Sequence, residues 1–407
     1  MSDEYWDWET KKAIMDYFDR RPEEQNSAPP EQAGDFYVVG KCLSRYFGPG
    51  GDVSIPEGIT GIGCGVFQDC EAAKITGITI PKSITRIDNH VFPYCANLSE
   101  IRVEEGNPRY CVIDGLLVEQ DGMVLHSCPP TRSGVLAIPE GITEIGNSAF
   151  AGCSNLTEVI IPEGVTKIGD DAFKFCGALT SVTIPEGVAH IGWSAFWNCG
   201  SLKDVTIPRS VTYIGNNAFM NCTNLTSVTI PEGVAHIGWG SFIACTNLAE
   251  IRVEAGNPHF CAINGMLLER DGFTLYLHTC PAAKSGVLEI PEGVTRVAEC
   301  AFDGCADLTE VIIPGSVREI GEGAFFRCGG LTEVIIPENV WKIDDSAFEG
   351  CTNLTHVALS QRVTHIGSGA FRDTGMSKEA VQAAYDQAEK NDLELELEAF
   401  DLLDNED

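Results

Sequence analysis

The sequence contains no apolar run of about eighteen residues, so we expect no membrane-spanning helix. Its first ten residues, MSDEYWDWET, have neither the basic start nor the apolar stretch of a secretory signal. This absence predicts a cytoplasmic protein, although an unconventional export route would leave the same sequence.

Basic residues are scarce. The 407 residues include 27 Lys and Arg against 59 Asp and Glu, a formal net charge of −32. Nucleic acids and anionic membranes would be repelled by such a surface, so we expect neither as a partner. The ends are the most acidic parts, since residues 1–34 carry nine acids and four bases and residues 377–407 carry eleven acids and two bases.

Catalytic and cofactor motifs are also missing. The sequence has no G-x-G-x-x-G after a strand pattern, no Walker loop, no G-x-S-x-G and no H-E-x-x-H. An active site needs unlike groups brought together, whereas this sequence repeats like groups at fixed intervals. We therefore expect no enzymatic activity and no cofactor.

What the sequence does contain is a repeat. Phe-x-x-Cys occurs ten times between Phe67 and Cys351, usually 23 residues apart. The longer unit around it starts at Ile55, Ile80, Ile138, Ile161, Ile184, Ile207, Ile230, Ile290, Ile313, Ile336 and Leu359, which gives eleven copies. A fixed period of this length predicts a solenoid, in which each turn buries its apolar face against its neighbours.

One unit, Leu179–Ile191, shows how a turn is expected to form. Its apolar residues first follow L-x-x-L-x-L, which is typical of a leucine-rich-repeat strand. Pro185-Glu186-Gly187 then predicts a turn, since proline presets φ and glycine closes the bend. A short helical or 3₁₀ segment is expected around Phe196. Seventeen cysteines cannot all pair within one chain, and we expect the ten in the repeats to be reduced and buried.

The pattern IPxxVTxIGxxAFxxCxxLTxV resembles the BspA-type leucine-rich repeat, a family of bacterial and protozoan surface proteins. The resemblance covers residues 35–374. It implies a solenoid that binds host or matrix proteins and takes part in adhesion. Because members of the family are typically exported, it also makes a cell-surface or secreted location the alternative to the cytoplasm.

Two insertions interrupt the period. The repeats starting at Ile80 and Ile230 span 58 and 60 residues, with hairpin insertions near 104–133 and 254–285. The insertions match each other, and Asn107 and Asn257 lie 150 residues apart, which indicates duplication of a block.

The organisation we expect therefore has four parts. Residues 1–34 form an acidic amphipathic helix plus linker, 35–54 an N-terminal cap or degenerate repeat, 55–376 an eleven-repeat solenoid with the two hairpin insertions, and 377–407 an acidic C-terminal cap or tail. The fold class is a leucine-rich-repeat solenoid, mainly parallel β, with α-helical flanks.

An aromatic cluster is the first candidate site. Most repeats carry a polar or small residue after Ile-Gly. The repeats that start at Ile184 and Ile230, which are separated by one repeat, carry tryptophan there. The candidate binding residues are Trp193, Trp197, Trp239, Tyr213, His190, His236, Met220 and Ile243. All fall in three consecutive turns, so they could form one patch on an acidic body. The alternative is that these side chains only pack the turns.

Two other features of the sequence are candidate sites. The outward positions of the strands, such as Thr183, Thr206 and Arg252, could form a binding face or a simple solvated sheet. Each insertion also holds a Cys followed by His-x-Cys, at Cys111, His126 and Cys128 and again at Cys261, His278 and Cys280. A fourth metal ligand is not evident, so we expect these residues to pack the hairpins and no metal to bind.

The sequence thus favours non-enzymatic recognition of a protein or glycan partner by the solenoid surface, adhesin-like by family resemblance. The alternative is a structural or assembly component that docks through its amphipathic termini. The oligomeric state remains open.

Overall fold

The computed structural model describes residues 31–67, 74–93 and 95–404, with side chains described as far as residue 392. The chain winds as a parallel β-solenoid of about 14 turns, so the predicted fold class is confirmed. The turns beyond the eleven predicted repeats come from the first described strands and the two insertions. The predicted N-terminal helix lies outside the described residues, within which α2 (Lys378–Asp404) is the one helix.

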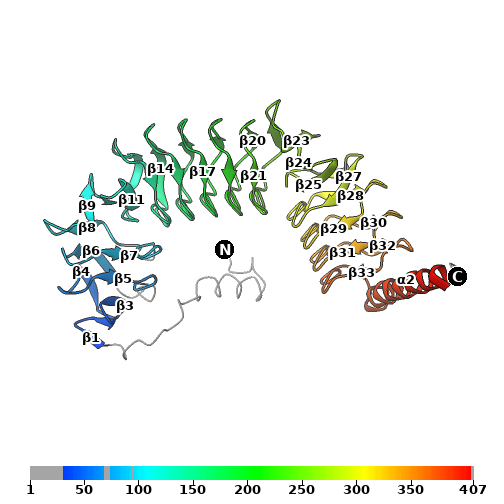
Figure 1. The fold of residues 1–407 in the computed structure, drawn as a ribbon, viewed down its shortest axis with the longest axis horizontal. Helices are drawn as coiled ribbons and strands as arrows, with labels where there is room; N and C mark the ends of the chain where they lie inside the picture. Colours follow the sequence, from blue (N-terminus) through cyan, green and yellow to red (C-terminus); the bar gives the residue numbers. More distant parts are fainter. Residues whose placement is uncertain (1–30, 68–73, 94, 405–407) are drawn as a thin grey trace.

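The solenoid is bent into an arch of three arms (Figure 1). Each arm begins with three antiparallel strands and continues with two series of parallel strands, one per face. We call the two series the inner and outer strands, because the former lie nearer the inside of the arch. The first arm holds β1 (Glu31–Ala33), β2 (Phe36–Val39) and β3 (Cys42–Tyr46), inner strands β5 (Gly61–Ile62) and β7 (Arg86–Ile87), and outer strands β4 (Gly50–Ser54), β6 (Lys74–Ile80) and β8 (Glu100–Val103).

The middle arm is the longest. It starts with β9 (Tyr110–Ile113), β10 (Leu116–Glu119) and β11 (Val124–Ser127). Its inner strands are β13 (Glu144–Ile145), β15 (Lys167–Ile168), β17 (His190–Ile191), β19 (Tyr213–Ile214) and β21 (His236–Ile237). Its outer strands are β12 (Ser133–Ala137), β14 (Asn155–Ile160), β16 (Ser181–Thr183), β18 (Asp204–Thr206), β20 (Ser227–Ile230) and β22 (Glu250–Val253).

The third arm repeats this plan. It starts with β23 (Phe260–Ile263), β24 (Met266–Asp271) and β25 (Thr274–Thr279). Its inner strands are β27 (Val294–Val297), β29 (Glu319–Ile320), β31 (Lys342–Ile343) and β33 (His365–Ile366), and its outer strands are β26 (Gly286–Glu289), β28 (Leu308–Ile312), β30 (Glu333–Ile335) and β32 (His356–Ala358). Helix α2 covers the last turn.

One phenylalanine per turn forms the centre of the core. The ring of Phe173 stacks on those of Phe150 and Phe196 with centroids 4.9 and 5.0 Å apart, and Phe196 stacks on Phe219 at 5.2 Å. All four rings are fully buried. Equivalent side chains therefore stack in register, as the 23-residue period predicts.

The repeat cysteines are reduced and link neighbouring turns. The thiol of Cys199 donates to the carbonyl oxygen of Phe173 in the preceding turn at 3.1 Å. The same bond recurs at Cys176, Cys222, Cys245, Cys328 and Cys351. Burial raises the pKa of Cys199 to about 12, so the thiol keeps its proton. Every described cysteine is free.

A left-handed backbone position stands two residues before each core phenylalanine. Glycine occupies it at Gly65, Gly240, Gly323 and Gly369, and elsewhere His90, Ser148, Asp171, Ser194, Asn217, Cys300 and Ser346 adopt φ of 51–59°. Asn, Asp and Gly tolerate this conformation best, which explains the small polar residues of the repeat at this point.

The two insertions form the corners of the arch. The inner sheet stops after β7 and after β21, and the buried apolar residues fall into three clusters that meet at the insertions. The three arms change direction at these two points (Figure 1). Each insertion folds like the β1–β2–β3 segment at the start of the first arm, with three antiparallel strands of which the last pairs in parallel with the next inner strand.

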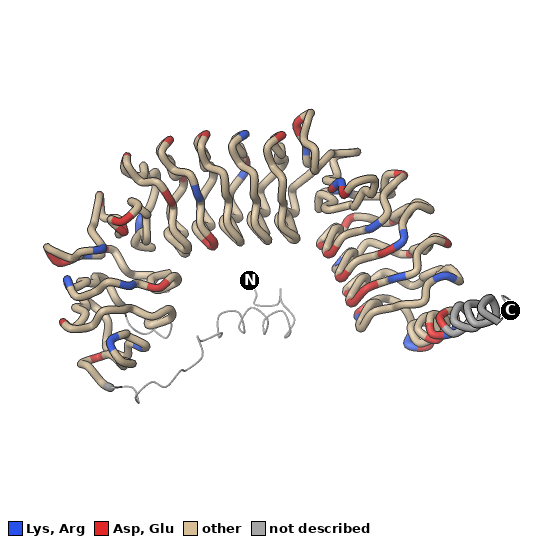
Figure 2. The backbone as a smooth tube through the Cα atoms, in the orientation of Figure 1, with Lys and Arg blue, Asp and Glu red and all other residues tan. Residues whose placement is uncertain are grey.

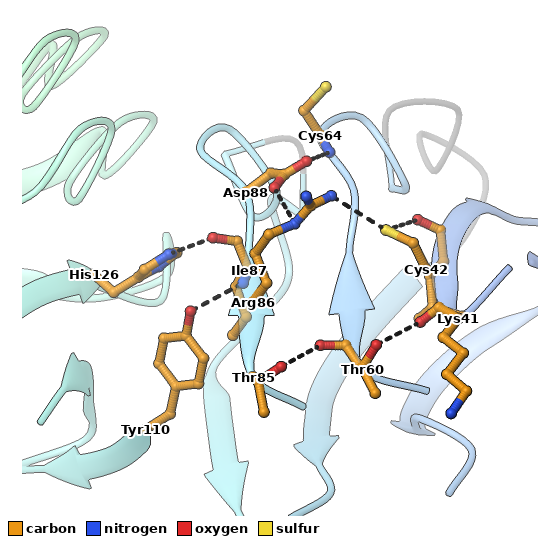
Figure 3. A network of polar contacts seen from close by, with 11 residues as sticks. Lys41, Cys42, Thr60, Cys64, Thr85, Arg86, Ile87, Asp88, Tyr110 and His126 are labelled. Atoms are coloured by element: carbon orange, nitrogen blue, oxygen red, sulfur yellow. Dashed lines mark hydrogen bonds and ion pairs between the residues drawn. The ribbon is translucent and has the colours of Figure 1, made fainter. Parts of the chain in front are cut away.

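Side chains replace the β-ladder across each corner. At the first corner the amide of Ile87 donates to Tyr110 Oη at 2.9 Å, and His126 Nε2 donates to the oxygen of Ile87 at 3.1 Å (Figure 3). At the second corner His278 Nε2 donates to the oxygen of Ile237 at 3.0 Å, while Phe260 stands at the tyrosine position and has no hydroxyl.

These histidines therefore connect the arms. Burial lowers the pKa of both His126 and His278, which keeps the rings neutral. Within the described residues no group of His, Cys, Asp and Glu side chains is placed to hold a metal ion.

An asparagine amide ends each arm. Asn107 Nδ2 donates to the oxygens of Pro81 and Ile84 at 2.9 and 3.1 Å. Asn257 makes the same two bonds, to Pro231 and Val234, at 2.8 and 3.0 Å. After the third arm, Asn391 of α2 bonds the oxygen of Val363 at 2.8 Å. The three buried amides satisfy carbonyl groups that the next turn of a regular solenoid would cover.

The corner tyrosine gives a reciprocal prediction. Tyr110→Phe removes the acceptor of the Ile87 amide and should cost about 1–2 kcal/mol, because a buried N–H loses its partner. Phe260→Tyr should protect the Ile237 amide and raise the melting temperature. Amide hydrogen exchange at Ile87 and Ile237 measures both effects, and unchanged exchange at both would contradict this role.

The cysteine column gives a second prediction. At pH 8 the native protein should react with iodoacetamide at exposed Cys64 first. Cys176, Cys199 and Cys222 should react slower by roughly a thousandfold or more, because they are buried and protonated. Mass spectrometry of the labelled peptides reads the order, with urea-unfolded protein as the control. Early labelling of Cys199 would mean that the stacked turns open readily.

Candidate binding surface

Three aromatic side chains form a ladder on the inner sheet of the middle arm. His190, Tyr213 and His236 begin β17, β19 and β21 and pair in register. The ring centroids of His190 and Tyr213 lie 4.5 Å apart, and those of Tyr213 and His236 lie 4.8 Å apart, with nearly parallel planes. The rings cover one another's faces, so the ladder offers ring edges, a hydroxyl and imidazole nitrogens. Burial, and then the charge of Lys167, lowers the pKa of His190.

Trp193 is fixed beside this ladder. Its Nε1 donates to Tyr213 Oη at 2.9 Å, and its backbone amide donates to Asp170 Oδ1 at 2.8 Å. The indole also lies against Gly215, where an added Cβ would come within 2.5 Å of Trp193 Cδ1. With 45% of its surface exposed, Trp193 is held in place and remains accessible.

Trp239 occupies the same repeat position two turns further on, with Asn216 between them. It lies two residues after the end of β21, at the second corner, and it is 52% exposed. The structure thus brings together His190, Tyr213, His236 and Trp193, with Trp239 at the end of the row. We call these five residues the aromatic strip.

The other three candidate residues lie elsewhere. Met220 and Ile243 are each 9% exposed and pack within the turns, so they add little to a surface. Trp197 is partly buried and contacts a different group, in which Lys174 Nζ lies 4.3 Å from its ring centroid and the Phe175 ring lies 5.7 Å away. Lys174 is itself buried and paired with Asp171 at 3.1 Å.

Phe175 was not anticipated from the sequence. It is 47% exposed and has a φ of 63°, a left-handed conformation that is strained for a bulky residue. Most equivalent positions hold Gly, Asn or Asp, such as Gly152, Asn198 and Asn221. A phenylalanine at a position where most repeats carry a turn residue was the signal available in the sequence.

A polar cavity of about 210 Å³ lies at the first corner, at the opposite end of the inner sheet from Trp239. Its lining includes Asn89, Glu119, His126, Glu144, Asn147 and Lys167. Glu144 and Lys167 belong to the same inner column as His190, since β13, β15 and β17 pair in register. The inner face of the middle arm therefore runs from a polar cavity to an exposed indole, with the ring ladder between them.

The outward column of the outer strands is mixed. It exposes apolar Ile160, Ile312 and Ile335 as well as Thr183, Thr206 and Arg252, and no ring contacts organise it. It offers no arrangement comparable to the aromatic strip.

The contact of Trp193 with Gly215 yields a prediction. Gly215→Ala should push the indole off its support, because the new methyl group overlaps Cδ1. We expect a red-shifted, more quenchable tryptophan emission. We also expect a loss of stability of roughly 1–3 kcal/mol, because the methyl group would come within 2.6 Å of the Trp193 backbone nitrogen and 2.7 Å of the Gly192 carbonyl carbon. Trp193→Phe in the same background identifies the affected ring. Emission unchanged by Gly215→Ala would show that the indole is not held in this way.

The chain is similar to a known repeat family and to solved proteins. The family model "BspA type Leucine rich repeat region" matches residues 51–110, 136–260 and 279–391. A solved leucine rich cell surface protein from Faecalibacterium prausnitzii is similar, with 26% identity over 88% of this chain and 98% of that one and a TM-score of 0.55. A leucine-rich repeat protein from Bacteroides ovatus is 25% identical over 86% of this chain and 90% of that one, with a TM-score of 0.39.

No curated protein matches the chain. In the described part of the chain no helix is long and apolar enough to cross a membrane. The family model spans most of the sequence, and its repeat is the one whose stacked turns build all three arms. The chain therefore belongs to the BspA type leucine-rich-repeat family.

Proposed function

We propose that this chain is a bacterial cell-surface binding protein that recognises a protein partner, or a glycan, along the inner face of its middle arm. The observation that carries the proposal is the aromatic strip. Interface hot spots are enriched in Trp and Tyr held rigidly in place, and here an indole is fixed by a hydrogen bond and a glycine support.

The proposed cell-surface location is supported by the family and by a similar solved protein. The similar protein from Faecalibacterium prausnitzii is described as a cell surface protein. Repeats of this family are typically non-enzymatic, and recognition needs only a preformed surface. A surface location is thus favoured over the cytoplasmic one.

A protein partner is favoured over a glycan. Sugars stack on exposed ring faces, but both faces of Tyr213 and one face each of His190 and His236 are covered within the ladder. What remains are ring edges and hydrogen-bonding atoms, together with two exposed indoles. Such a mixture suits the side chains and backbone of a polypeptide.

The assembly alternative has less support. Tyr385 Oη and Asn391 Nδ2 of α2 bond carbonyl oxygens of the last turn, those of Gly367 and Val363, and Ala384 and Ala388 are buried against it. These contacts suit a cap that protects the end of the solenoid. The N-terminal segment proposed for docking lies outside the described residues.

The test is a binding screen of the intact chain against extracellular-matrix proteins and a glycan array. For any partner found, Trp193→Ala with Trp239→Ala should weaken binding at least tenfold without lowering the melting temperature by more than a few degrees. Trp341→Ala is the matched control, because Trp341 is similarly exposed (44%) but lies in the third arm. A double variant that binds like the wild type would refute the proposed surface.

A further inference from the structure

The two corners descend from one duplicated block, so each residue of the first has an equivalent in the second. The strand registers fix the pairs, since Tyr110 lies opposite Glu119 and Phe260 lies opposite Glu269. Next to these pairs Arg109 corresponds to His259, and by the same 150-residue spacing Asn89 corresponds to Trp239. Differences between the corners are therefore informative.

The carboxylate is neutralised at the first corner only. There Arg109 Nη2 lies 2.6 Å from Glu119 Oε1. At the second corner His259 replaces the arginine, and no ion pair joins Glu269 to another residue in the part of the chain that the structure describes. At the first corner the guanidinium of Arg109 thus pairs with Glu119. At the second corner the equivalent carboxylate, that of Glu269, lacks such a partner.

The surroundings of Glu269 do not replace the lost arginine. Burial raises the pKa of its carboxyl group, opposed by His236 and His259 and reinforced by Asp271 and Glu299. The adjacent Arg270 is turned away, because its Nη1 donates to the oxygen of Asn257 at 3.0 Å and to that of Phe260. A partly buried carboxylate with acidic neighbours attracts a cation.

An exposed aromatic ring borders the same corner. Asn89 lines the cavity of the first corner together with Glu119, and Trp239 occupies the position of Asn89 in the second. Trp239 is also the most exposed tryptophan of the aromatic strip. By this equivalence we expect the indole of Trp239 on the same side of the corner as Glu269. An indole together with a carboxylate is a combination that binds guanidinium and ammonium groups, by cation–π attraction and a charge-assisted hydrogen bond.

We propose that the second corner binds an arginine side chain of the protein partner, with Glu269 accepting the guanidinium and Trp239 lying against it. The inference rests on the proposed function and specifies the chemistry of its partner. A net charge of −32 on this chain favours a basic partner for the same reason.

The experiment titrates the intact protein with the blocked peptide acetyl-Ala-Arg-Ala-amide at low ionic strength and follows tryptophan emission. The same peptide with citrulline, which has the shape of arginine without its charge, is the control ligand. We expect a saturable change with the arginine peptide that is at least fivefold weaker with citrulline and absent in Trp239→Phe. Equal responses to the two peptides would overturn the proposal, as would a response that survives Trp239→Phe.

Two variants locate the site. Glu269→Gln should weaken the arginine peptide at least fivefold, whereas Glu119→Gln at the first corner should leave its affinity unchanged. His259→Arg should recreate the ion pair of the first corner and block the peptide while leaving Glu269 and Trp239 in place. Full binding to His259→Arg would contradict the proposal. So would a calcium-induced emission change that is lost in Glu269→Gln and matched by no arginine response, since the site would then bind a metal ion.

The outcome is separable from that of the proposed function. A partner whose binding depends on Trp193 but is indifferent to Glu269→Gln and His259→Arg would leave the aromatic strip as the binding surface and refute the arginine site alone.

Discussion

The structure depends on the stacking of one turn on the next. No turn has enough apolar surface to fold alone, and Phe173 is buried only because Phe150 and Phe196 lie on its two faces. Because stacking requires equivalent side chains to lie in register, it also decides what the surface looks like. A residue that is exposed in one turn has its equivalents beside it in the next, so the aromatic strip is a by-product of the core's own regularity (Figure 1).

The period of 23 residues was sufficient to predict the solenoid, the phenylalanine column and the column of buried cysteines, since these follow from local spacing. It also gathered His190, Tyr213 and Trp193. It could not predict that Met220 and Ile243 are buried while Phe175 is exposed. The exposure of side chains in these turns depends on the local backbone conformation, such as the positive φ of Phe175, which the spacing does not reveal. Nor could it predict the arch, since the direction change arises where the inner sheet ends and tertiary contacts such as His126 to Ile87 take over.

The arrangement of charged residues also differs between the arms and the corners. Lys and Arg are few and lie scattered among the acidic residues along the arms (Figure 2). The corners differ in their ion pairs. The first corner pairs Arg109 with Glu119, whereas the second carries His259 in place of the arginine. A repeat protein acquires a local site most easily at such a place, where a substitution changes one position and leaves the column of its equivalents intact.

The buried asparagine amides bear on how the number of arms could change by recombination. Asn107 and Asn257 contact the turns before them through the same two carbonyl groups, so either could follow the last turn of the other's arm. Excising the 150 residues between them would join the first arm to the third with that contact complete. The junction would lack only the hydroxyl that Phe260 does not supply. Arms are thus exchangeable units, and recombination between the two blocks would change the span of the arch while keeping the asparagine contact at the junction.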